Sequence, residues 1–204
     1  MSHNTPLIGL IGKKRTGKDT FAAVLMEKHG YERVAFADPL RQAALELDPL
    51  VGTFALLDDG ITRVREWRLS DVIDSIGWEK AKDYVPEVRR ILQRFGTEAI
   101  RKIDDDFWIR AAFAKIDAAR EVGSPVVVTD VRYPNEADAI RDAGGYIVRI
   151  TRDLPGDADT HASETALDGY RENLLVPNNG TKSDFEYMAN SLGIDLKLIY
   201  SAMQ

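Results

Sequence analysis

The sequence predicts an α/β fold, in which a central parallel sheet carries helices on both faces and forms three layers. Apolar runs of strand length alternate with stretches of helical periodicity along the chain, which is typical of this class. The clearest runs, 7–11 and 125–129, are apolar at nearly every position, as expected for strands buried on both faces. The carboxyl ends of parallel strands share one edge of the sheet, and we expect the functional residues there.

The other elements follow in chain order. After the first strand, Phe21, Val24 and Leu25 recur at helical spacing, and Gly30 is suited to end this helix. Further strands are expected at 31–36, 146–150 and 174–176. Near the end of the chain, a last helix is predicted from residue 183 by Phe185, Met188 and Leu192.

The stretch 38–121 is helical and charged, and we expect it to form an inserted helical region. Its amphipathic stripes are Val88, Ile91, Leu92 and Phe95, and then Ile109, Phe113 and Ile116. Residues 53–61 lack periodicity and predict a loop, whereas 151–165, rich in Asp, Gly, Pro and Thr, predict a mobile lid. We therefore expect a single domain, 1–204, with its core in 1–37 and 122–204.

Composition narrows the classes of function. The chain has 204 residues, of which 44% are hydrophobic, so it can build a substantial core. A net charge of −6 argues against a general nucleic-acid or anionic-membrane surface. The absence of cysteine excludes disulfides and thiolate metal sites. No apolar run is long enough to cross a membrane, and we expect a cytoplasmic protein.

The most informative segment follows the first strand and has the spacing of a phosphate-binding loop. It consists of Gly12, Lys13, Lys14, Arg15, Thr16, Gly17, Lys18, Asp19 and Thr20. Glycines at its two ends let backbone N–H groups turn inward, the next helix adds the positive end of its dipole, and Lys18 can reach the outer phosphates. A nucleoside triphosphate fits this pattern. The alternative is a glycine-rich turn without a ligand.

One position departs from the usual loop, because Asp19 stands where a serine or threonine normally offers its hydroxyl to Mg²⁺. Either Asp19 approaches the metal, directly or through water, or it caps the helix while Thr20 supplies the hydroxyl. We slightly favour Asp19.

A dense polar cluster comes directly after the expected strand 125–129. Asp130 projects at the sheet edge where the phosphate loop also lies, and Arg132 and Glu136 follow it. We expect these residues in the site. The alternative is a strand exit followed by a capped helix, in which Glu136 complements the helix dipole.

The helical insert offers further cations that could bind phosphate. Arg89 and Arg101 flank Gly96 and Thr97, and arginine forks bind phosphate in a bidentate manner. Taken alone, arginines at this spacing are more often a solvated face, and Trp108 is more often a core aromatic. Arg63, Arg65 and Arg68 are equally ambiguous, with one of them expected to be functional.

The late part of the chain adds two arginines and a polar turn. Arg149 and Arg152 end a strand and could neutralise charge during phosphoryl transfer. The polar turn 178–181 is suited to contact a nucleobase, although it also reads as a simple turn.

Together, several segments resemble the phage-type deoxynucleoside monophosphate kinases. They are Gly-Lys-Asp-Thr at 17–20, Phe-Ala-Asp-Pro-Leu at 36–40, Leu-Gln-Arg-Phe-Gly-Thr-Glu at 92–98 with Arg101, Phe-Trp at 107–108, Asp-Val-Arg-Tyr-Pro-Asn-Glu at 130–136 and Asn-Asn-Gly-Thr at 178–181. The match spans most of the chain, and the combination is more specific than any single motif. The loop aspartate is common in this family.

The resemblance implies a nucleoside-monophosphate-kinase-like P-loop fold that transfers the γ-phosphate of ATP to a deoxynucleoside 5′-monophosphate, with Mg²⁺. It places ATP on the phosphate loop and on Asn179, Gly180 and Thr181, and the metal on Asp19 and Thr20. It places the monophosphate on Phe36, Asp38, Arg65, Arg89, Gly96, Thr97, Arg101, Trp108, Asp130, Arg132 and Glu136. Lys18, Arg132, Arg149 and Arg152 would be the catalytic cations.

Two other functions compete with this one. Another small P-loop kinase, resembling dephospho-coenzyme A kinase, would share the loop and the late arginines. A nucleotide-dependent switch or binding module would need no arginine-rich acceptor side. We expect only small molecules as partners, leave a homodimer open, and expect the host cell cytoplasm if the protein is phage-encoded.

Overall fold

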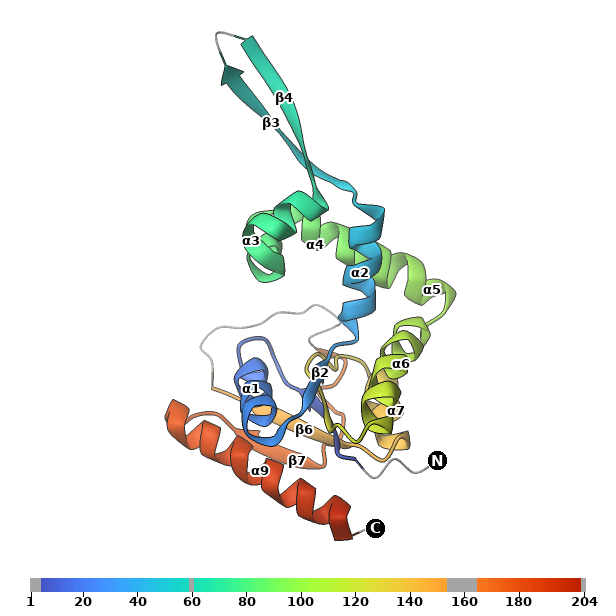
Figure 1. Ribbon diagram of the computed structural model, residues 1–204, viewed down its shortest axis with the longest axis vertical. Coiled ribbons are helices and arrows are strands. Elements are labelled where there is room, and N and C mark those ends of the chain that lie inside the picture. Colours follow the sequence, from blue (N-terminus) through green and yellow to red (C-terminus); the bar gives the residue numbers. More distant parts are fainter. Residues whose placement is uncertain (1–4, 59–60, 154–164, 203–204) are drawn as a thin grey trace. The chain divides into compact units, whose positions relative to one another are not determined.

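The computed structural model describes residues 5–58, 61–153 and 165–202 (Figure 1). Contacts within the chain divide it into two compact units. The first, here called the sheet unit, comprises Met1–Phe36 and Ile109–Gln204, and the second, the helical unit, comprises Ala37–Trp108. Each unit has its own hydrophobic core.

The sheet unit is built on five parallel strands in the order β2-β5-β1-β6-β7. Their bounds are β1 Leu7–Ile11, β2 Glu32–Val34, β5 Val126–Val128, β6 Tyr146–Thr151 and β7 Leu174–Pro177. All five expected strands are confirmed, although β2 and β5 are shorter than expected. Because every pair is parallel, the carboxyl ends of the strands share one edge, and the loop that follows β1 begins there.

Alternation along β1 explains the three layers of this unit. Leu7 and Ile11 face a core that includes residues of α6 (Phe107–Glu121) and α7 (Pro134–Asp142). Ile8 and Leu10 face a second core, formed with α1 (Lys18–His29) and α9 (Lys182–Ala202). Successive side chains of a strand point to opposite faces, so an entirely apolar strand requires cover on both sides. The α/β prediction, with helices on both faces, is confirmed.

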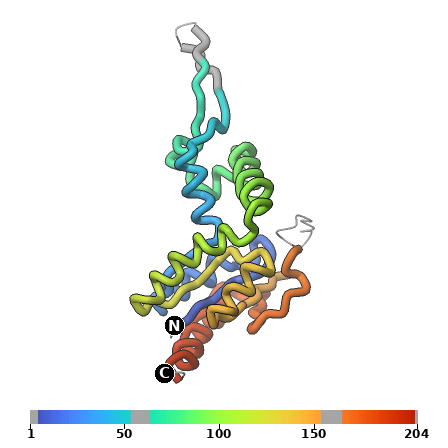
Figure 2. Tube along the Cα trace, turned by 90° about the vertical axis from the view of Figure 1, so that its right-hand side faces the viewer, coloured from blue at the N-terminus to red at the C-terminus, as the bar shows by residue number. Residues whose placement is uncertain are grey.

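Both expected helices that flank the second core are confirmed, and Figure 2 follows them as the blue α1 and the red α9. Gly30 ends α1 in the left-handed conformation, with φ 70°, and its N–H donates to the carbonyl oxygen of Met26 at 3.1 Å. The N–H of Tyr31 then donates to the carbonyl oxygen of Leu25 at 3.3 Å, which completes the helix end predicted from the glycine.

The helical unit contains α2 (Ala37–Leu47), α3 (Leu69–Tyr84), α4 (Pro86–Gln93), a π-helical segment η1 (Arg94–Ile100) and the short α5 (Arg101–Ile103). Its core brings together Ala44, Val51, Leu69, Val72, Ala81 and Val88. Between α2 and α3 lies an antiparallel hairpin, β3 (Leu50–Asp58) with β4 (Ile61–Arg68). The loop expected at 53–61 is therefore wrong, because cross-strand hydrogen bonding organises a segment that has no periodicity of its own.

The boundary of the insert also differs from the expected 38–121. Ile109, Ala112 and Ile116 bury the apolar face of α6 in the core of the sheet unit, so the second compact unit ends at Trp108. Of the expected lid at 151–165, residues 154–164 lie outside the described residues. The single domain stays a prediction. None of the helices in the described part of the chain combines the length and apolar character needed to cross a membrane.

Candidate active site

The loop after β1 is closed tightly around its two glycines. Gly12 has φ 139°, and a Cβ there would lie 2.2 Å from the carbonyl oxygen of Ile150 on the neighbouring strand. Gly17 has φ 108°, and a Cβ there would lie 2.5 Å from Nδ2 of Asn178. A side chain at either position would have to displace its neighbours. The loop thus takes a shape that glycine permits and other residues do not.

Within this loop the backbone presents unpaired donors. The N–H groups of Arg15, Thr16 and Gly17 donate no hydrogen bond to any of the residues that the structure describes. Immediately after them α1 begins at Lys18, whose ammonium lies 2.6 Å from the carbonyl oxygen of Gly12 and 2.8 Å from that of Lys13. Free N–H groups at a helix start, beside a lysine, form a site suited to phosphate.

Asn178 braces the loop from the end of β7. Its side chain is buried, and Nδ2 donates to the carbonyl oxygen of Thr16 at 2.8 Å. Thr16 is also buried, and its hydroxyl donates to the carbonyl oxygen of Lys13 at 2.9 Å. The turn predicted to contact a nucleobase therefore begins with a residue that holds the phosphate loop.

The rest of that turn makes local contacts. Asn179 binds Asp153, donating from Nδ2 at 2.7 Å and accepting the Asp153 N–H at 2.9 Å. Thr181 accepts the Asp184 N–H at 3.2 Å, and the Asp184 carboxylate accepts the Thr181 N–H at 3.0 Å, so the two residues cap α9. Hydrogen bonds from the Thr181 hydroxyl and N–H lower the pKa of Asp184. Adenine contacts by Asn179, Gly180 and Thr181 stay a prediction.

Asp19 and Thr20 lie in the first turn of α1. The N-cap of this helix is Gly17, so Asp19 occupies the second helical position, and its exposed carboxylate is not the cap. That geometry removes the alternative in which Asp19 caps the helix. No group of three or more acidic or histidine side chains in the described residues could hold a metal alone. Mg²⁺ commonly needs only one or two protein oxygens beside phosphate and water, and both side chains fit that need.

At the same edge of the sheet, the exits of β5 and β2 are tied together. Oδ1 of Asp130 accepts the N–H of Phe36 at 2.8 Å. The ring of Phe36 is buried in the core shared with α6. Two of the residues predicted for the monophosphate are thus brought into direct contact by a carboxylate that lies shortly after the end of β5.

Glu136 contacts the backbone at the start of α7, as in the alternative in which this segment is a strand exit followed by a capped helix. It is buried, and its Oε2 accepts the N–H groups of Arg132 at 2.7 Å and Tyr133 at 3.1 Å, which caps the start of α7. The side chain of Arg132 is exposed. Glu136 therefore fixes the backbone from which Arg132 projects, and a direct contact of Glu136 with substrate stays a prediction.

The two late arginines differ sharply. Arg149 is largely buried and donates to the Glu172 carboxylate at 2.8 Å and to the carbonyl oxygens of Leu167 and Tyr170 at 2.9 and 2.6 Å. The hydrogen bond from Arg149 is the largest cause that lowers the pKa of Glu172. Arg152 is exposed and makes no hydrogen bond or ion pair among the described residues. Of the two, Arg152 is the cation available to a ligand.

In the helical unit, η1 brings three predicted residues together. The carbonyl oxygen of Gly96 accepts the backbone N–H of Arg101, five residues on, and the indole N–H of Trp108 at 3.1 Å. A Cβ on Gly96 would lie 2.5 Å from Leu40 of α2. Thr97, in the same widened turn, is exposed. Single π-helical turns occur often at functional sites, and no sequence pattern predicted this one.

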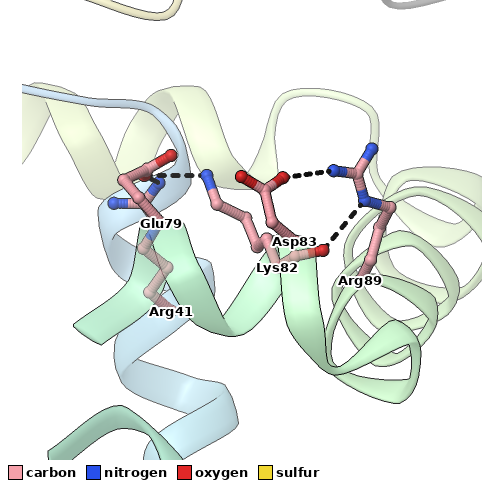
Figure 3. Close-up of polar contacts among 5 residues, drawn as sticks. All are labelled: Arg41, Glu79, Lys82, Asp83 and Arg89. Carbon is pink, nitrogen blue, oxygen red and sulfur yellow. Dashed lines mark hydrogen bonds and ion pairs between the residues drawn. The ribbon is translucent and has the colours of Figure 1, made fainter. Parts of the chain in front are cut away.

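Two of the predicted arginines of this unit contact acidic side chains. The guanidinium of Arg101 is mostly buried and donates to Asp105 at 2.9 Å. Figure 3 shows Arg89 against Asp83 and the carbonyl oxygen of Lys82, both at 3.4 Å. These long contacts between exposed groups contribute little to stability, so Arg89 can exchange partners at small cost.

Figure 3 also shows a cation that the sequence did not single out. Arg41 of α2 donates to Glu79 at 3.4 Å, and Lys82 shares the same carboxylate at 2.8 Å. The Arg41 guanidinium lies over the Trp78 ring at 5.6 Å. The remaining predicted residues of this unit are Asp38, half-buried in the first turn of α2, and Arg65, exposed on β4 and without a polar partner among the described residues.

Comparison with known proteins decides the family. Residues 50–188 match the family model described as deoxynucleotide monophosphate kinase. The chain is also 32% identical over 195 residues to a putative deoxynucleotide monophosphate kinase of Acanthamoeba polyphaga mimivirus, covering 88% of this chain and 91% of that protein. The chain belongs to the deoxynucleotide monophosphate kinase family.

A second relative of this kinase comes from Enterobacteria phage T4. The T4 deoxynucleotide monophosphate kinase is 23% identical over 244 residues, covering 92% of this chain and 99% of the phage protein. Among solved structures, a sugar kinase from Janibacter sp. HTCC2649 is similar with a TM-score of 0.47 at 13% identity, covering 96% of this chain and 98% of that one. So weak a structural likeness supports no functional conclusion. The predicted family and its enzyme class, a phosphotransferase, are confirmed.

Proposed function

We propose that this kinase transfers the γ-phosphoryl group of ATP to the 5′-phosphate of a deoxynucleoside monophosphate. An oxygen of the acceptor phosphate forms a bond to the γ-phosphorus while the bond to the β-phosphate oxygen breaks, giving ADP and the deoxynucleoside diphosphate. The phosphate loop carries this proposal, since it combines Gly12 and Gly17 with unpaired N–H groups and Lys18. The acceptor phosphate is already anionic, so no general base is required.

ATP would be held by the loop that follows β1. The N–H groups of Arg15, Thr16 and Gly17 have no acceptor among the described residues and could bind phosphate oxygens, and the ammonium of Lys18 lies against the carbonyl oxygens of Gly12 and Lys13 in the same loop. Asp19 and Thr20 would hold Mg²⁺ beside the phosphates. When bound, Mg²⁺ supplies charge neutralisation for the β- and γ-phosphates.

The residues predicted for the monophosphate fall into two sets, each described within its own unit. In the sheet unit these are Phe36, Asp130, Arg132 and Glu136, of which Asp130 fixes Phe36 and Glu136 fixes the backbone of Arg132. In the helical unit they are Asp38, Arg65, Arg89, Gly96, Thr97, Arg101 and Trp108. The contact of Gly96 with both Arg101 and Trp108 supports a shared role for these three.

Charge on the transferring group would be stabilised mainly by Lys18, Arg132 and Arg152. Arg132 and Arg152 are exposed and the Lys18 ammonium lies within the phosphate loop, whereas Arg149 is committed to Glu172 and two carbonyl oxygens. We therefore propose that the main role of Arg149 is to anchor the segment before β7. Its contact with phosphate stays a prediction. The homodimer and the cytoplasmic location also remain predictions.

An ADP-release assay tests the proposal. The wild-type protein is supplied with ATP and Mg²⁺ and with each of the four deoxynucleoside monophosphates, their ribose counterparts, and dephospho-coenzyme A. We expect ADP release to depend on at least one deoxynucleoside monophosphate. Stimulation by dephospho-coenzyme A alone would indicate the rival kinase, and slow release that no acceptor stimulates would indicate a switch.

The matched variants are Lys18→Ala and Lys28→Ala, which each remove one lysine from the same helix. Lys28 lies exposed in its last turn, away from the loop. We expect Lys18→Ala to lower turnover on the order of 10²- to 10³-fold, as for loss of a key electrostatic contact, with circular dichroism unchanged. Lys28→Ala should retain wild-type turnover. Near-normal turnover of Lys18→Ala would contradict its catalytic role.

A further inference from the structure

The segment before β7, residues 165–172, is fastened to the sheet unit by contacts that do not involve the phosphate loop. Arg149 of β6 holds Glu172 and two carbonyl oxygens. The hydroxyl of Tyr170 donates to Asp138 of α7 at 2.6 Å, and the Arg141 guanidinium lies 4.8 Å from the centre of the Tyr170 ring. These contacts fix the position of the segment.

Asp168, in the middle of this segment, is directed at the phosphate loop. Its Oδ1 lies 2.8 Å and its Oδ2 3.1 Å from the ammonium of Lys13. The two side chains are about half exposed, at 46% for Lys13 and 55% for Asp168. An ion pair this exposed adds little to the stability of the whole fold, so its effect is local to the loop.

The backbone of Lys13 contacts two other residues of the phosphate loop. Its carbonyl oxygen accepts the Lys18 ammonium at 2.8 Å and the Thr16 hydroxyl at 2.9 Å. Its side chain is bound by Asp168, which belongs to a segment that is itself anchored. Fixing the side chain of Lys13 restricts the backbone that positions Lys18 and Thr16.

We propose that Asp168 is a positioning residue for ATP, acting through Lys13 to hold the phosphate loop in its binding shape. The inference rests on the proposed function, because it assumes that ATP occupies this loop. No sequence motif marks Asp168, and its partner lies 155 positions earlier in the chain. The structure alone relates the two.

The direction in which Asp168→Asn changes KM for ATP separates a positioning role from simple electrostatic repulsion. A carboxylate next to a phosphate site repels ATP, so by charge alone Asp168→Asn would lower KM for ATP. If Asp168 orders the loop, the same change raises KM for ATP, because binding must then restrict a more mobile Lys13. The range for exposed ion pairs corresponds to a rise of about 1.5- to 5-fold.

The test compares Asp168→Asn with Asp138→Asn in steady-state kinetics and thermal unfolding. Asp138 anchors the same segment through Tyr170 and has no contact with Lys13 among those that the structure gives. We expect Asp168→Asn to raise KM for ATP, with KM for the acceptor unchanged. Asp168→Glu, which keeps the carboxylate, should stay within about twofold of wild type. Asp138→Asn should lower Tm at least as much as Asp168→Asn does, and it should raise KM for ATP less than Asp168→Asn does, because Arg149 still holds the segment and the Asp168–Lys13 pair is kept.

A double-mutant cycle identifies Lys13 as the intermediary. In a Lys13→Met background, Asp168→Asn should have no further effect on KM for ATP, since the pair is already broken. An unchanged or lowered KM in Asp168→Asn alone, or an equal effect in both backgrounds, would overturn the proposal. Failure of the wild-type protein to bind ATP in calorimetry would instead contradict the proposed function itself.

Discussion

Replacing Asn178 with alanine probes how the end of β7 supports the phosphate loop. The change removes a buried amide whose Nδ2 donates to the carbonyl oxygen of Thr16 at 2.8 Å. Leaving a buried carbonyl without its donor costs about 1–3 kcal/mol. For a chain of this size each kcal/mol shifts Tm by about 2–4 °C, so we expect Tm to fall by roughly 2–12 °C.

Asn179→Ala is the matched control. It removes the same amide from the next residue, whose contacts with Asp153 are exposed. Such surface substitutions usually stay within about 0.5 kcal/mol, which corresponds to less than about 2 °C. Both variants are compared by differential scanning calorimetry, and KM for ATP is measured in parallel.

Asn178→Ala should weaken ATP binding by the phosphate loop as well as lower Tm. Since Asn178 holds Thr16, we expect Asn178→Ala to raise KM for ATP several-fold, whereas its effect on KM for the acceptor should be small. Equal Tm values for the two variants, together with a wild-type KM for ATP in Asn178→Ala, would refute the bracing role of Asn178.

Two further predictions concern backbone strain and pH. Gly12→Ala should lower the free energy of unfolding by more than about 3 kcal/mol, because its Cβ would meet the Ile150 carbonyl oxygen. Gly30→Ala should lower it by about 1–2 kcal/mol, from the positive φ alone. Urea unfolding measures both variants, and equal losses would contradict the clash at Gly12. The pKa of Glu172 is lowered in the folded protein, mainly by Arg149, so its stabilisation is present above the unfolded pKa of about 4.3 and is lost as pH falls through the folded value. Glu172→Gln should therefore lower Tm at pH 7, and the difference from wild type should shrink as the pH falls below about 4; a pH-independent difference would show that the charge is not responsible.

The sheet unit could be predicted closely from sequence because its signals are local and redundant. The apolar runs 7–11 and 146–150 and the helix ending at Gly30 all match the structure. The two strands are marked by apolar runs, and the helix by apolar residues at helical spacing followed by a glycine that can take the left-handed conformation of a helix end. Such agreement is what makes an element readable without tertiary information.

The hairpin β3–β4 was missed because its stability comes from pairing between strands. Residues 53–61 show neither alternation nor helical spacing, and hydrogen bonds to the partner strand define the structure. A usable signal was present in the sequence, since the pair Asp59-Gly60, a little after the apolar run 54–57, is typical of hairpin turns. Similarly, the spacing of Val88, Ile91 and Leu92 predicts a helix but contains no sign of the wider turns of η1 that follow.

For the candidate site, sequence indicated where residues lie in the fold more reliably than what their side chains contact. Asp130 was placed at the sheet edge by its position after a strand, and the structure has it there. Glu136 caps the start of its own helix through local contacts, whereas Asn178 and Arg149 hold segments that are distant in sequence. A polar residue next to a motif looks the same in sequence whether it binds a ligand or a backbone group.

Transfer of labelled phosphate is the most direct test of the proposed reaction. The wild-type kinase is incubated with [γ-³²P]ATP, Mg²⁺ and each deoxynucleoside monophosphate, and the products are separated by chromatography. We expect the label in a deoxynucleoside diphosphate, formed in equal amount with ADP, and formed on the order of 10²- to 10³-fold more slowly by Lys18→Ala. Label recovered only as inorganic phosphate, with every acceptor present, would contradict phosphoryl transfer between two nucleotides.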